Sequence, residues 1–233
     1  MKTTVVLAMT ADGKIADRDR TAARFGSPQD QWHLQQQVAL ADAVLFGAGT
    51  LRAYGTTLTV HHPDLQTQRR SQGKPEQPIQ IVCSRQAAFD STWRFFSQPI
   101  PRWLLTTAPG AIAWQNHSAF DRVVVAPERQ NSARSEERQW DWPAIFQQFS
   151  REGIDRLAVL GGGDLVGSLF AADLVDELWL TVCPLILGGT TAPSPVAGDG
   201  FLAQQAPRLE LLAVQPVGQE VFLHYRVIRR NEA

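Results

Sequence analysis

The sequence predicts an α/β fold on a mixed sheet, with parallel strands first and antiparallel strands at the C-terminal edge. Short apolar runs alternate with helix-like segments along most of the chain. Two late strands, 208–215 and 219–228, are joined at Pro216-Val217-Gly218, which is typical of a hairpin. Strands that alternate with helices favour a parallel sheet, whereas strands joined by a tight hairpin pair antiparallel, so we expect both arrangements in one sheet.

The composition indicates a globular protein with a sizeable core. Of the 233 residues, 44% are apolar and 19% charged, and the net charge of −1 provides no basic face for nucleic acid. Cys83 and Cys183 each lie in an apolar run, so we expect buried free thiols rather than a disulfide or a metal site. The N-terminal apolar run is too short for a signal peptide, and no later segment approaches a membrane span. We therefore expect a cytoplasmic protein that forms a single domain over 1–233 and has no nucleic-acid or membrane partner.

The strands before the hairpin are predicted from short apolar runs with polar or glycine-containing borders. The runs are 3–9, 43–46, 78–83, 102–107, 122–126 and 157–160. A further strand lies within 176–187, where apolar and other residues alternate until Pro184 interrupts the pattern. We expect the segments 10–26, 54–77, 127–140 and 193–200 to be loops, and 84–101 to be irregular or a short helix.

Helix signals stand between these runs. Ser27 is a good N-cap, Pro28 fits the first helical position, and Asp30 suits the first turn. The apolar stripe of this helix is Leu34, Val38 and Ala41. Asp141 caps a second helix, which Gly153 ends.

Two strands run directly into glycine-rich turns. The strand at 43–46 continues into Gly47-Ala48-Gly49-Thr50, and the strand at 157–160 continues into Gly161-Gly162-Gly163 before a helix. Glycine lets backbone N–H groups approach a ligand closely, and a helix N-terminus favours an anion. If the two turns are neighbours, they can hold the two phosphates of a dinucleotide at the carboxyl ends of the strands. The alternative is that the glycines only make strand-to-helix turns.

Three stretches, in order and suitably spaced along nearly the whole chain, together resemble the reductase domain of riboflavin biosynthesis, a relative of dihydrofolate reductase in fold. They are AMTADGKIA at 8–16, LFGAGTL at 45–51, and VLGGGDLVGSLFAADLVDELWLTVCPLILGG at 159–189. The resemblance implies a dihydrofolate-reductase-like three-layer fold, with a mixed, mostly parallel central sheet and helices on both faces. In the family this domain is often fused to a deaminase, and we expect a stand-alone reductase domain here.

The resemblance also implies an activity. It is the NADPH-dependent reduction of 5-amino-6-(5-phosphoribosylamino)uracil to the ribitylamino form, by hydride transfer to C1 of the sugar. The residues it places at the cofactor are Met9, Gly49, Thr50, Gly161, Gly162, Gly163, Asp164 and Leu165. Lys14 is similar to the family's lysine that reaches the substrate sugar, so Lys14 and its neighbour Asp12 are the candidate catalytic residues. His61 is a candidate substrate-binding residue.

Each of these assignments has a structural alternative. Asp12 can be a turn residue, Lys14 a solvated lysine, and Thr50 a helix cap. Asp164 would repel a phosphate, so we interpret it as an acid that stabilises the helix dipole with its side chain turned aside.

The chain departs from the family where the substrate binds. The family has arginines at the positions of Val38 and His61, and these arginines help to hold the substrate phosphate. It has an acid at the position of Tyr54 and a glutamate at that of Leu160. Cations that can substitute for the missing charges are Arg24, Arg52 and His62. The cofactor half of the signature is therefore intact, while the substrate half is eroded.

Two other functions remain open. One is a reductase of another small carbonyl, imine or pterin-like compound on the same fold, and the other is a nucleotide-binding protein without turnover. The preference for NADPH over NADH is also open, because Arg129, Arg134 and Arg138 can either meet a 2′-phosphate or belong to a solvated charged loop. The family tends to dimerise, and we expect a homodimer in which the apolar strand at 178–187 forms the interface.

Overall fold

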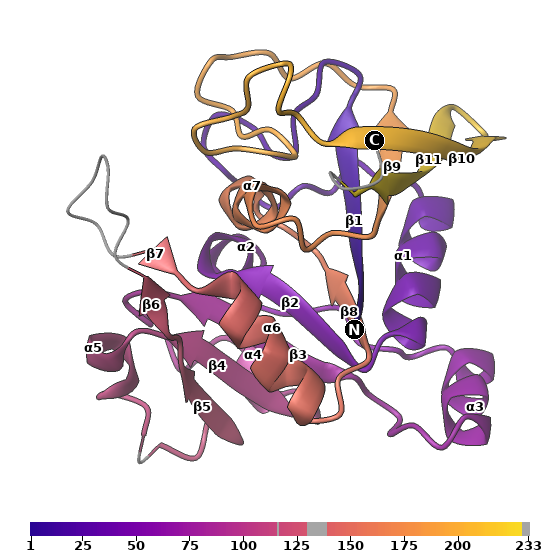
Figure 1. The fold of residues 1–233 in the computed structure, drawn as a ribbon. Coiled ribbons are helices and arrows are strands. Elements are labelled where there is room, and N and C mark those ends of the chain that lie inside the picture. The colour runs from indigo at the N-terminus through magenta and orange to yellow at the C-terminus, as the bar shows by residue number, and fades with distance from the viewer. Residues whose placement is uncertain (116, 130–138, 230–233) are drawn as a thin grey trace.

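The computed structural model describes residues 1–115, 117–129 and 139–229 (Figure 1). Within this part of the chain, nine strands form one sheet in the order β10-β11-β9-β1-β8-β2-β3-β4-β5. The strands are β1 (Lys2–Thr10), β2 (Ala43–Gly47), β3 (Ile79–Ser84), β4 (Arg102–Thr106), β5 (Arg122–Val125), β8 (Arg156–Val159), β9 (Glu177–Cys183), β10 (Arg208–Val217) and β11 (Glu220–Ile228). From β9 to β5 every neighbouring pair is parallel, and β11 joins β9 antiparallel with β10 outside it. The predicted mixed sheet and its C-terminal hairpin are confirmed.

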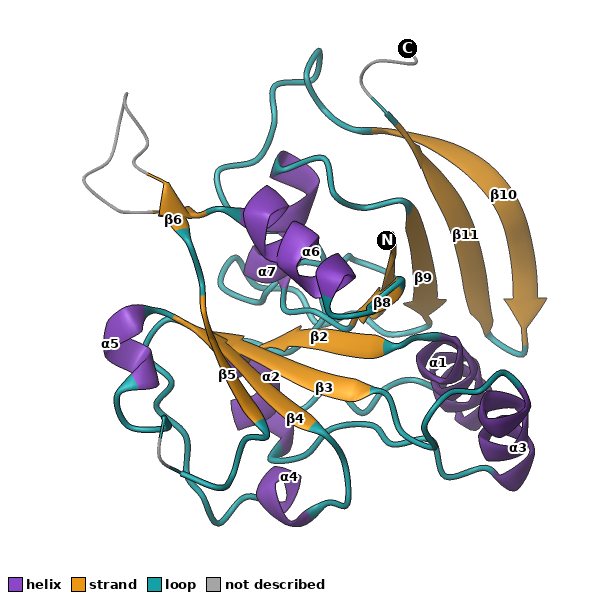
Figure 2. Ribbon diagram, turned by 60° about the horizontal axis from the view of Figure 1, so that its bottom comes forward, coloured by secondary structure: helices purple, strands orange, loops and turns teal. Residues whose placement is uncertain are grey.

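Helices cover both faces of the sheet, which gives the predicted three layers (Figures 1 and 2). The helices are α1 (Pro28–Leu40), α2 (Ala48–Tyr54), α3 (Pro63–Ser71), α4 (Arg94–Ser97), α5 (Ala108–Ala111), α6 (Trp142–Arg151) and α7 (Gly163–Ala171). One core cluster joins α6 and α7 to the sheet, and a second joins α1, α2, α3 and α4 to the opposite face. None of the helices in the described ranges combines the length and the apolar character needed to span a membrane.

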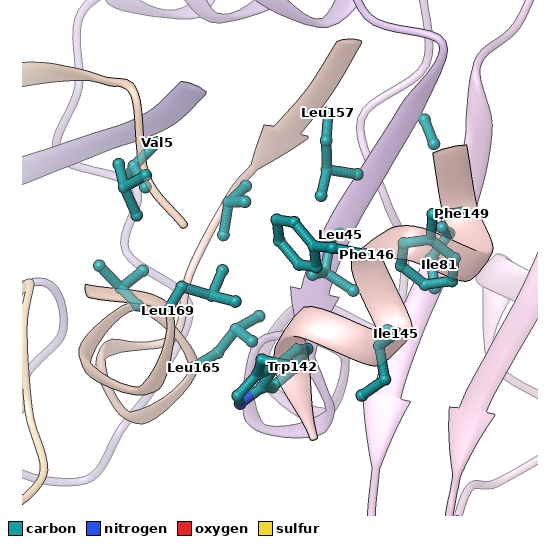
Figure 3. Packing of buried hydrophobic residues seen from close by; sticks show 14 of the residues in the cluster. Val5, Leu45, Ile81, Trp142, Ile145, Phe146, Phe149, Leu157, Leu165 and Leu169 are labelled. Atoms are coloured by element: carbon teal, nitrogen blue, oxygen red, sulfur yellow. The ribbon is translucent and has the colours of Figure 1, made fainter. Parts of the chain in front are cut away.

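The first core cluster packs two helices onto the centre of the sheet (Figure 3). Ile145 and Phe149 of α6 and Leu169 of α7 are fully buried against strand residues such as Leu45 and Ile81. Burying one such side chain contributes about 1.5–3 kcal/mol, so this cluster holds both helices against the sheet. The start of α7 is thereby held at the end of β8.

Several predicted boundaries are confirmed. Ser27 caps α1 by accepting a hydrogen bond from the Asp30 N–H, with Pro28 in the first turn. Asp141 caps α6 by accepting from the Ala144 N–H. Both cysteines are free, as expected, and Cys183 is buried.

The expectation of a loop over 54–77 is wrong, because α3 lies inside it. This helix has little apolar periodicity, since Leu65 is its buried apolar residue. It is instead attached through Arg69, which is 1% exposed and donates to the carbonyls of Ala39 and Ala41 at the end of α1. A helix held by one buried guanidinium leaves no hydrophobic pattern for sequence analysis to detect.

The expected loop at 127–140 is also partly structured. Glu128–Arg129 (β6) and Gln139–Trp140 (β7) pair antiparallel, and residues 130–138 lie outside the described part. The strand expected to form a dimer interface, 178–187, is not a free edge, because β9 is paired with β1 on one side and β11 on the other. The edge strands of the sheet are β10 and β5 instead.

Candidate cofactor and substrate site

The two glycine turns lie side by side at the carboxyl ends of β2 and β8. The Gly47 N–H donates to the Gly161 carbonyl at 2.8 Å, and the Leu160 N–H donates to the Leu45 carbonyl at 3.0 Å. A Cβ built on Gly47 would lie 3.4 Å from the Gly162 nitrogen. The predicted adjacency is therefore confirmed, and its cause is that β2 and β8 are parallel neighbours whose ends meet at one edge.

The space in front of these turns is free of side chains. A Cβ on Gly49 would meet no atom within 4 Å, and a Cβ on Gly162 would meet only the Thr50 hydroxyl, at 3.9 Å. No side chain caps the N-terminus of α2, which begins after Gly47, or of α7, which begins after Gly162. Exposed N–H groups of this kind attract an anion, so the residues here fit the diphosphate of a dinucleotide.

The other glycines of α7 have a packing role. A Cβ on Gly163 would collide with the Ser194 carbonyl, and one on Gly167 would collide with the Ala197 carbonyl. The Ala197 N–H donates to the Gly163 carbonyl at 3.0 Å. The loop at 192–197 therefore lies directly against α7, and Gly163 meets that loop rather than open space.

The two residues after Gly163 differ in exposure. Leu165 is 7% exposed and belongs to the core between α7 and the sheet, so its side chain is not offered to a ligand. Asp164 is exposed in the first turn of α7, where a negative charge favours the helix dipole. The roles predicted for both residues at the cofactor remain predictions.

The Asp12-Gly13-Lys14 turn is organised by Thr10, the last residue of β1. The Thr10 hydroxyl donates to Asp12 Oδ1 at 2.5 Å and accepts from the Lys14 N–H at 2.9 Å. The Asp12 carboxylate also accepts from the N–H groups of Leu187 and Gly188, at 3.2 and 2.6 Å. These hydrogen bonds, that of Thr10 first, lower the pKa of Asp12 to about 2. Asp12 is thus an ionised residue that fastens two loops together, which agrees with its interpretation as a turn residue.

Lys14 lies on the same rim as the glycine turns. Its Nζ donates to the Ala192 carbonyl at 3.3 Å, and the Ile15 N–H donates to the Pro193 carbonyl at 2.9 Å. Because the following residues of this loop pack on Gly163 and Gly167, the loop connects the lysine turn to the start of α7. Met9, one residue before Thr10, is partly exposed at the end of β1.

His61 is placed elsewhere. Its N–H donates to Gln35 in the middle of α1, and its ring lies 3.3 Å from the Gln35 amide and from the Thr59 carbonyl. The contacts described for His61 join it to α1 and to its own loop, not to Lys14 or the glycine turns. Its predicted role in substrate binding therefore gains no geometric support.

The other departures from the family also have structural roles. Val38 is fully buried in the core on the α1 face of the sheet, so this position supplies packing and no charge. Tyr54 donates its hydroxyl to the Ala23 carbonyl at 2.7 Å, and Leu160 packs on the second core cluster. Among the proposed substitutes, His62 caps α3 and packs against Trp32. Each of these side chains thus packs against, or hydrogen-bonds to, residues next to it in the fold.

The charged loop is only partly visible. Arg129 pairs with Asp141 at 2.5 Å, so its guanidinium is engaged with the cap of α6. Arg134 and Arg138 lie outside the described residues.

Sequence analysis missed the surroundings of Asp30. The carboxyl of Asp30 lies against Thr181 of β9, near Glu220 of β11. The sequence showed Asp30 only as an acid in the first turn of a helix, and Thr181 and Glu220 are far away along the chain. The signal that was available is a helix N-terminus directly after the long loop that follows β1.

Comparison with known proteins supports the same region. A model of the RibD C-terminal domain matches residues 1–223. A 2,5-diamino-6-ribosylamino-4(3H)-pyrimidinone 5′-phosphate reductase from Archaeoglobus fulgidus is 28% identical over 198 residues, covering 85% of this chain and 87% of that protein. A protein of the same name from Methanothermobacter thermautotrophicus is 28% identical, covering 94% and 95%.

Solved structures show the fold. A pyrimidine reductase-like protein from Corynebacterium diphtheriae superposes with a TM-score of 0.77 at 22% identity, covering 98% of this chain and 92% of that one. Dihydrofolate reductase from Enterococcus faecalis, complexed with NADP(H), superposes with a TM-score of 0.51 at 11% identity, covering 97% and 96%. The predicted fold class is confirmed.

Proposed function

This chain belongs to the RibD C-terminal domain family, and from that membership we propose that it is a pyrimidine reductase of riboflavin biosynthesis. It would reduce the ribosylamino group of a 6-ribosylaminopyrimidine 5′-phosphate to the ribitylamino group, with NADPH as the reductant. Two bases fit this description. The sequence-based expectation is the uracil form, and the archaeal relatives are named for the 2,5-diaminopyrimidinone form.

The observation that carries the proposal is the pair of open glycine turns beside the lysine turn. Gly49 and Gly162 leave space for a diphosphate, and the uncapped start of α7 offers it N–H groups. Thr50 lies beside this space, within reach of the same ligand. The loop at 192–197 joins this anion site to Lys14, so that cofactor and sugar would meet on one rim.

The residues of the chain would bind and orient the reactants. A nicotinamide cofactor, when bound, supplies the hydride for C1 of the ring-opened sugar. Lys14 Nζ has one described partner, the Ala192 carbonyl, and therefore keeps N–H groups for a sugar hydroxyl or the substrate phosphate. Asp12 would hold the lysine turn in place rather than transfer a proton, because its pKa of about 2 keeps it ionised. Alignment of the reacting atoms can supply about 7–11 kcal/mol of the barrier in such a reaction.

The proposal is tested with the purified chain, NADPH and each of the two pyrimidine phosphates. We expect loss of NADPH absorbance together with formation of the ribitylamino product, identified by mass. Binding of NADPH without turnover of either pyrimidine would leave a reductase of another substrate or a non-catalytic protein. Absence of binding of both NADPH and NADH would reject a nicotinamide-dependent reductase.

Two finer features belong to the same proposal. NADPH rather than NADH is the expected reductant, and competition between the two in the same assay decides it. A homodimer is the expected assembly, formed through β10 rather than β9, because β10 is an edge strand of the sheet and carries exposed leucines. A cytoplasmic location fits a biosynthetic enzyme of this kind.

A further inference from the structure

One side of α7 consists of glycine, and the loop at 192–197 lies directly on it. Gly163 and Gly167 are one helical turn apart, so they face the same way. A Cβ on Gly163 would collide with the Ser194 carbonyl oxygen, and a Cβ on Gly167 would collide with the Ala197 carbonyl oxygen. The loop is therefore seated at a place where only glycine leaves room for it.

The other side of α7 is fixed by the core. Val166 and Leu169 are fully buried, and Phe170 nearly so, in the cluster that packs this helix on the sheet. Moving the helix would open voids there and lose van der Waals contacts. The loop is attached to α7 by the hydrogen bond from the Ala197 N–H to the Gly163 carbonyl and by its packing on the two glycines. A side chain introduced on the glycine side would therefore displace the loop and not the helix.

The far end of the same loop holds Lys14. The Lys14 Nζ donates to the Ala192 carbonyl at 3.3 Å, and the Ile15 N–H donates to the Pro193 carbonyl at 2.9 Å. Ala192 is buried, so this end of the loop is packed as well. Because both acceptors are backbone carbonyls of the loop, the position of the lysine follows the position of the loop.

The loop is stiff between these two attachments. The rings of Pro193 and Pro195 fix φ at two of its positions, and the Ser194 hydroxyl donates to the Val196 carbonyl at 2.8 Å. A displacement at one end of a stiff segment is passed to the other end. Glycines with positive φ, where the chain can turn without strain, stand on both sides of the loop: Gly188, Gly189, Gly198 and Gly200.

We propose that Gly167 is a positioning residue: by giving the loop at 192–197 its seat on α7, it holds Lys14 where the sugar or phosphate of the substrate binds. Gly167 is covered by Ala197 and lies one turn beyond the start of α7, so it acts through the loop and not by touching the reactants. This inference rests on the proposed reductase function, which gives Lys14 its role. The alternative is that Gly167 only permits close packing, and that the hydrogen bonds within the Asp12–Lys14 turn place the lysine.

The test is Gly167→Ala, with Ser168→Ala as the matched control. An alanine at position 167 would force the Ala197 carbonyl to move by roughly 1 Å or more to reach an ordinary contact distance. Ser168 is exposed on the same helix, so its substitution does not touch the loop. We expect Gly167→Ala to lower kcat/KM for the pyrimidine substrate about 10- to 100-fold, mainly through KM, because Lys14 contributes binding. Ser168→Ala should match wild type. The Kd for NADPH should equal that of wild type in both variants, which also shows that they are folded.

A double-mutant cycle determines whether the effect passes through Lys14. In a Lys14→Met background, Gly167→Ala should lower kcat/KM no further, since two changes that remove the same interaction do not add. Equal losses with and without the lysine would overturn the inference, and so would an unchanged kcat/KM in Gly167→Ala.

A second variant, Pro195→Gly, covers the case in which Gly167→Ala does not fold. It leaves α7 as it is and loosens the loop, because glycine restores the freedom in φ that proline removes. We expect KM for the pyrimidine to rise here too, and only when Lys14 is present. If KM stays at the wild-type value, the loop does not position the lysine and the inference is rejected.

Labelling of lysine amines separates this inference from the proposed function. Acetic anhydride labels Lys14 in competition with Lys2 and Lys74, which are each paired with a carboxylate and serve as internal references. Peptide mass spectrometry should show faster labelling of Lys14 in Gly167→Ala than in wild type, with the references unchanged. If wild type reduces neither pyrimidine but Lys14 labelling still rises in the variant, the reductase function fails and the positioning of Lys14 stands. Unchanged labelling would reject the positioning, whether or not the chain is a reductase.

Discussion

At the scale of single residues, Gly162 is the position where a side chain would most directly displace the cofactor. A Cβ there would meet only the Thr50 hydroxyl, so Gly162→Asp should fold, and its carboxylate would occupy the space proposed for a diphosphate. We expect the Kd for NADPH to rise at least about 10-fold, because like charges at close range repel. Fluorescence titration with NADPH measures this.

The matched control for Gly162→Asp is Ser168→Asp, which adds the same charge to the same helix at an exposed position. Its affinity for NADPH should equal that of wild type. Equal weakening in both variants would mean that the charge acts through the helix and not through the turn.

Asp12 allows a second test at this scale, because the structure makes it a fastening residue. With a pKa of about 2, Asp12 contributes its hydrogen bonds across the whole range above that value and loses them only as pH falls through it. Asp12→Asn should lower kcat/KM about 10-fold, because it loosens the Lys14 turn. The pH profile of kcat/KM should keep its shape over roughly pH 5 to 9. A variant that removes one limb of the pH profile would identify Asp12 as a proton donor instead.

At the scale of elements, α1 depends on Arg69 for its attachment at the C-terminal end. The guanidinium donates to the Ala39 and Ala41 carbonyls at 2.8 and 2.6 Å, and to the Pro75 carbonyl at 2.7 Å. Arg69→Met would keep most of the side-chain volume and leave these three carbonyl acceptors without a donor. Each acceptor that water does not reach would cost about 1–3 kcal/mol of stability. We expect a loss of about 3 kcal/mol in the free energy of unfolding, measured by urea denaturation. Arg70→Met is the control, because Arg70 is exposed and pairs with Glu76 on the surface.

The other side of α1 contains a histidine that makes its packing sensitive to pH. His33 packs against Trp179 and Phe222, and its Nε2 is buried with no hydrogen-bond partner in the described residues. Burial, and then the nearby His224, lower the pKa of His33 below the ordinary 6.5. The unfolded chain therefore takes up the proton at a higher pH than the folded chain. The contribution of His33 to stability is complete above the pKa of the unfolded chain, and it is lost as pH falls from there toward the lower pKa of the folded chain.

The loss is at most about 1.4 kcal/mol for each pH unit between the two pKa values. His33→Phe should flatten this part of the stability curve, measured by urea denaturation from above the ordinary histidine pKa to below it. His117→Gln, which replaces an exposed histidine, should leave the pH dependence of stability as in wild type. An unchanged slope in His33→Phe would assign the pH dependence to another group.

At the scale of the whole molecule, the sequence was sufficient where neighbours along the chain determine the structure. The caps Ser27 and Asp141 act on residues three positions away, and the two glycine turns are adjacent because parallel strands end at the same edge. Sequence analysis failed where residues far apart along the chain determine the local structure. Asp30 acquires its setting from Thr181 and Glu220, and the charge of Arg69 holds α3 without any apolar pattern.

The free edge of the sheet leads to the last prediction, which concerns assembly. Along β10, Leu209, Leu211 and Val214 are 40%, 52% and 51% exposed, and one edge of this strand has no partner in the described structure. An exposed apolar edge strand is a surface that proteins normally cover, and a second copy of the same strand covers it with backbone hydrogen bonds and leucine contacts. Light scattering at micromolar concentration should give twice the mass of one chain. Leu211→Arg should give the mass of one chain, because the two introduced arginines would face each other in a desolvated interface. The control Leu202→Arg, on a loop leucine that is 71% exposed, should leave the dimer intact. A monomeric wild type would rule out the dimer, and a dimer that survives Leu211→Arg would place the interface elsewhere than β10.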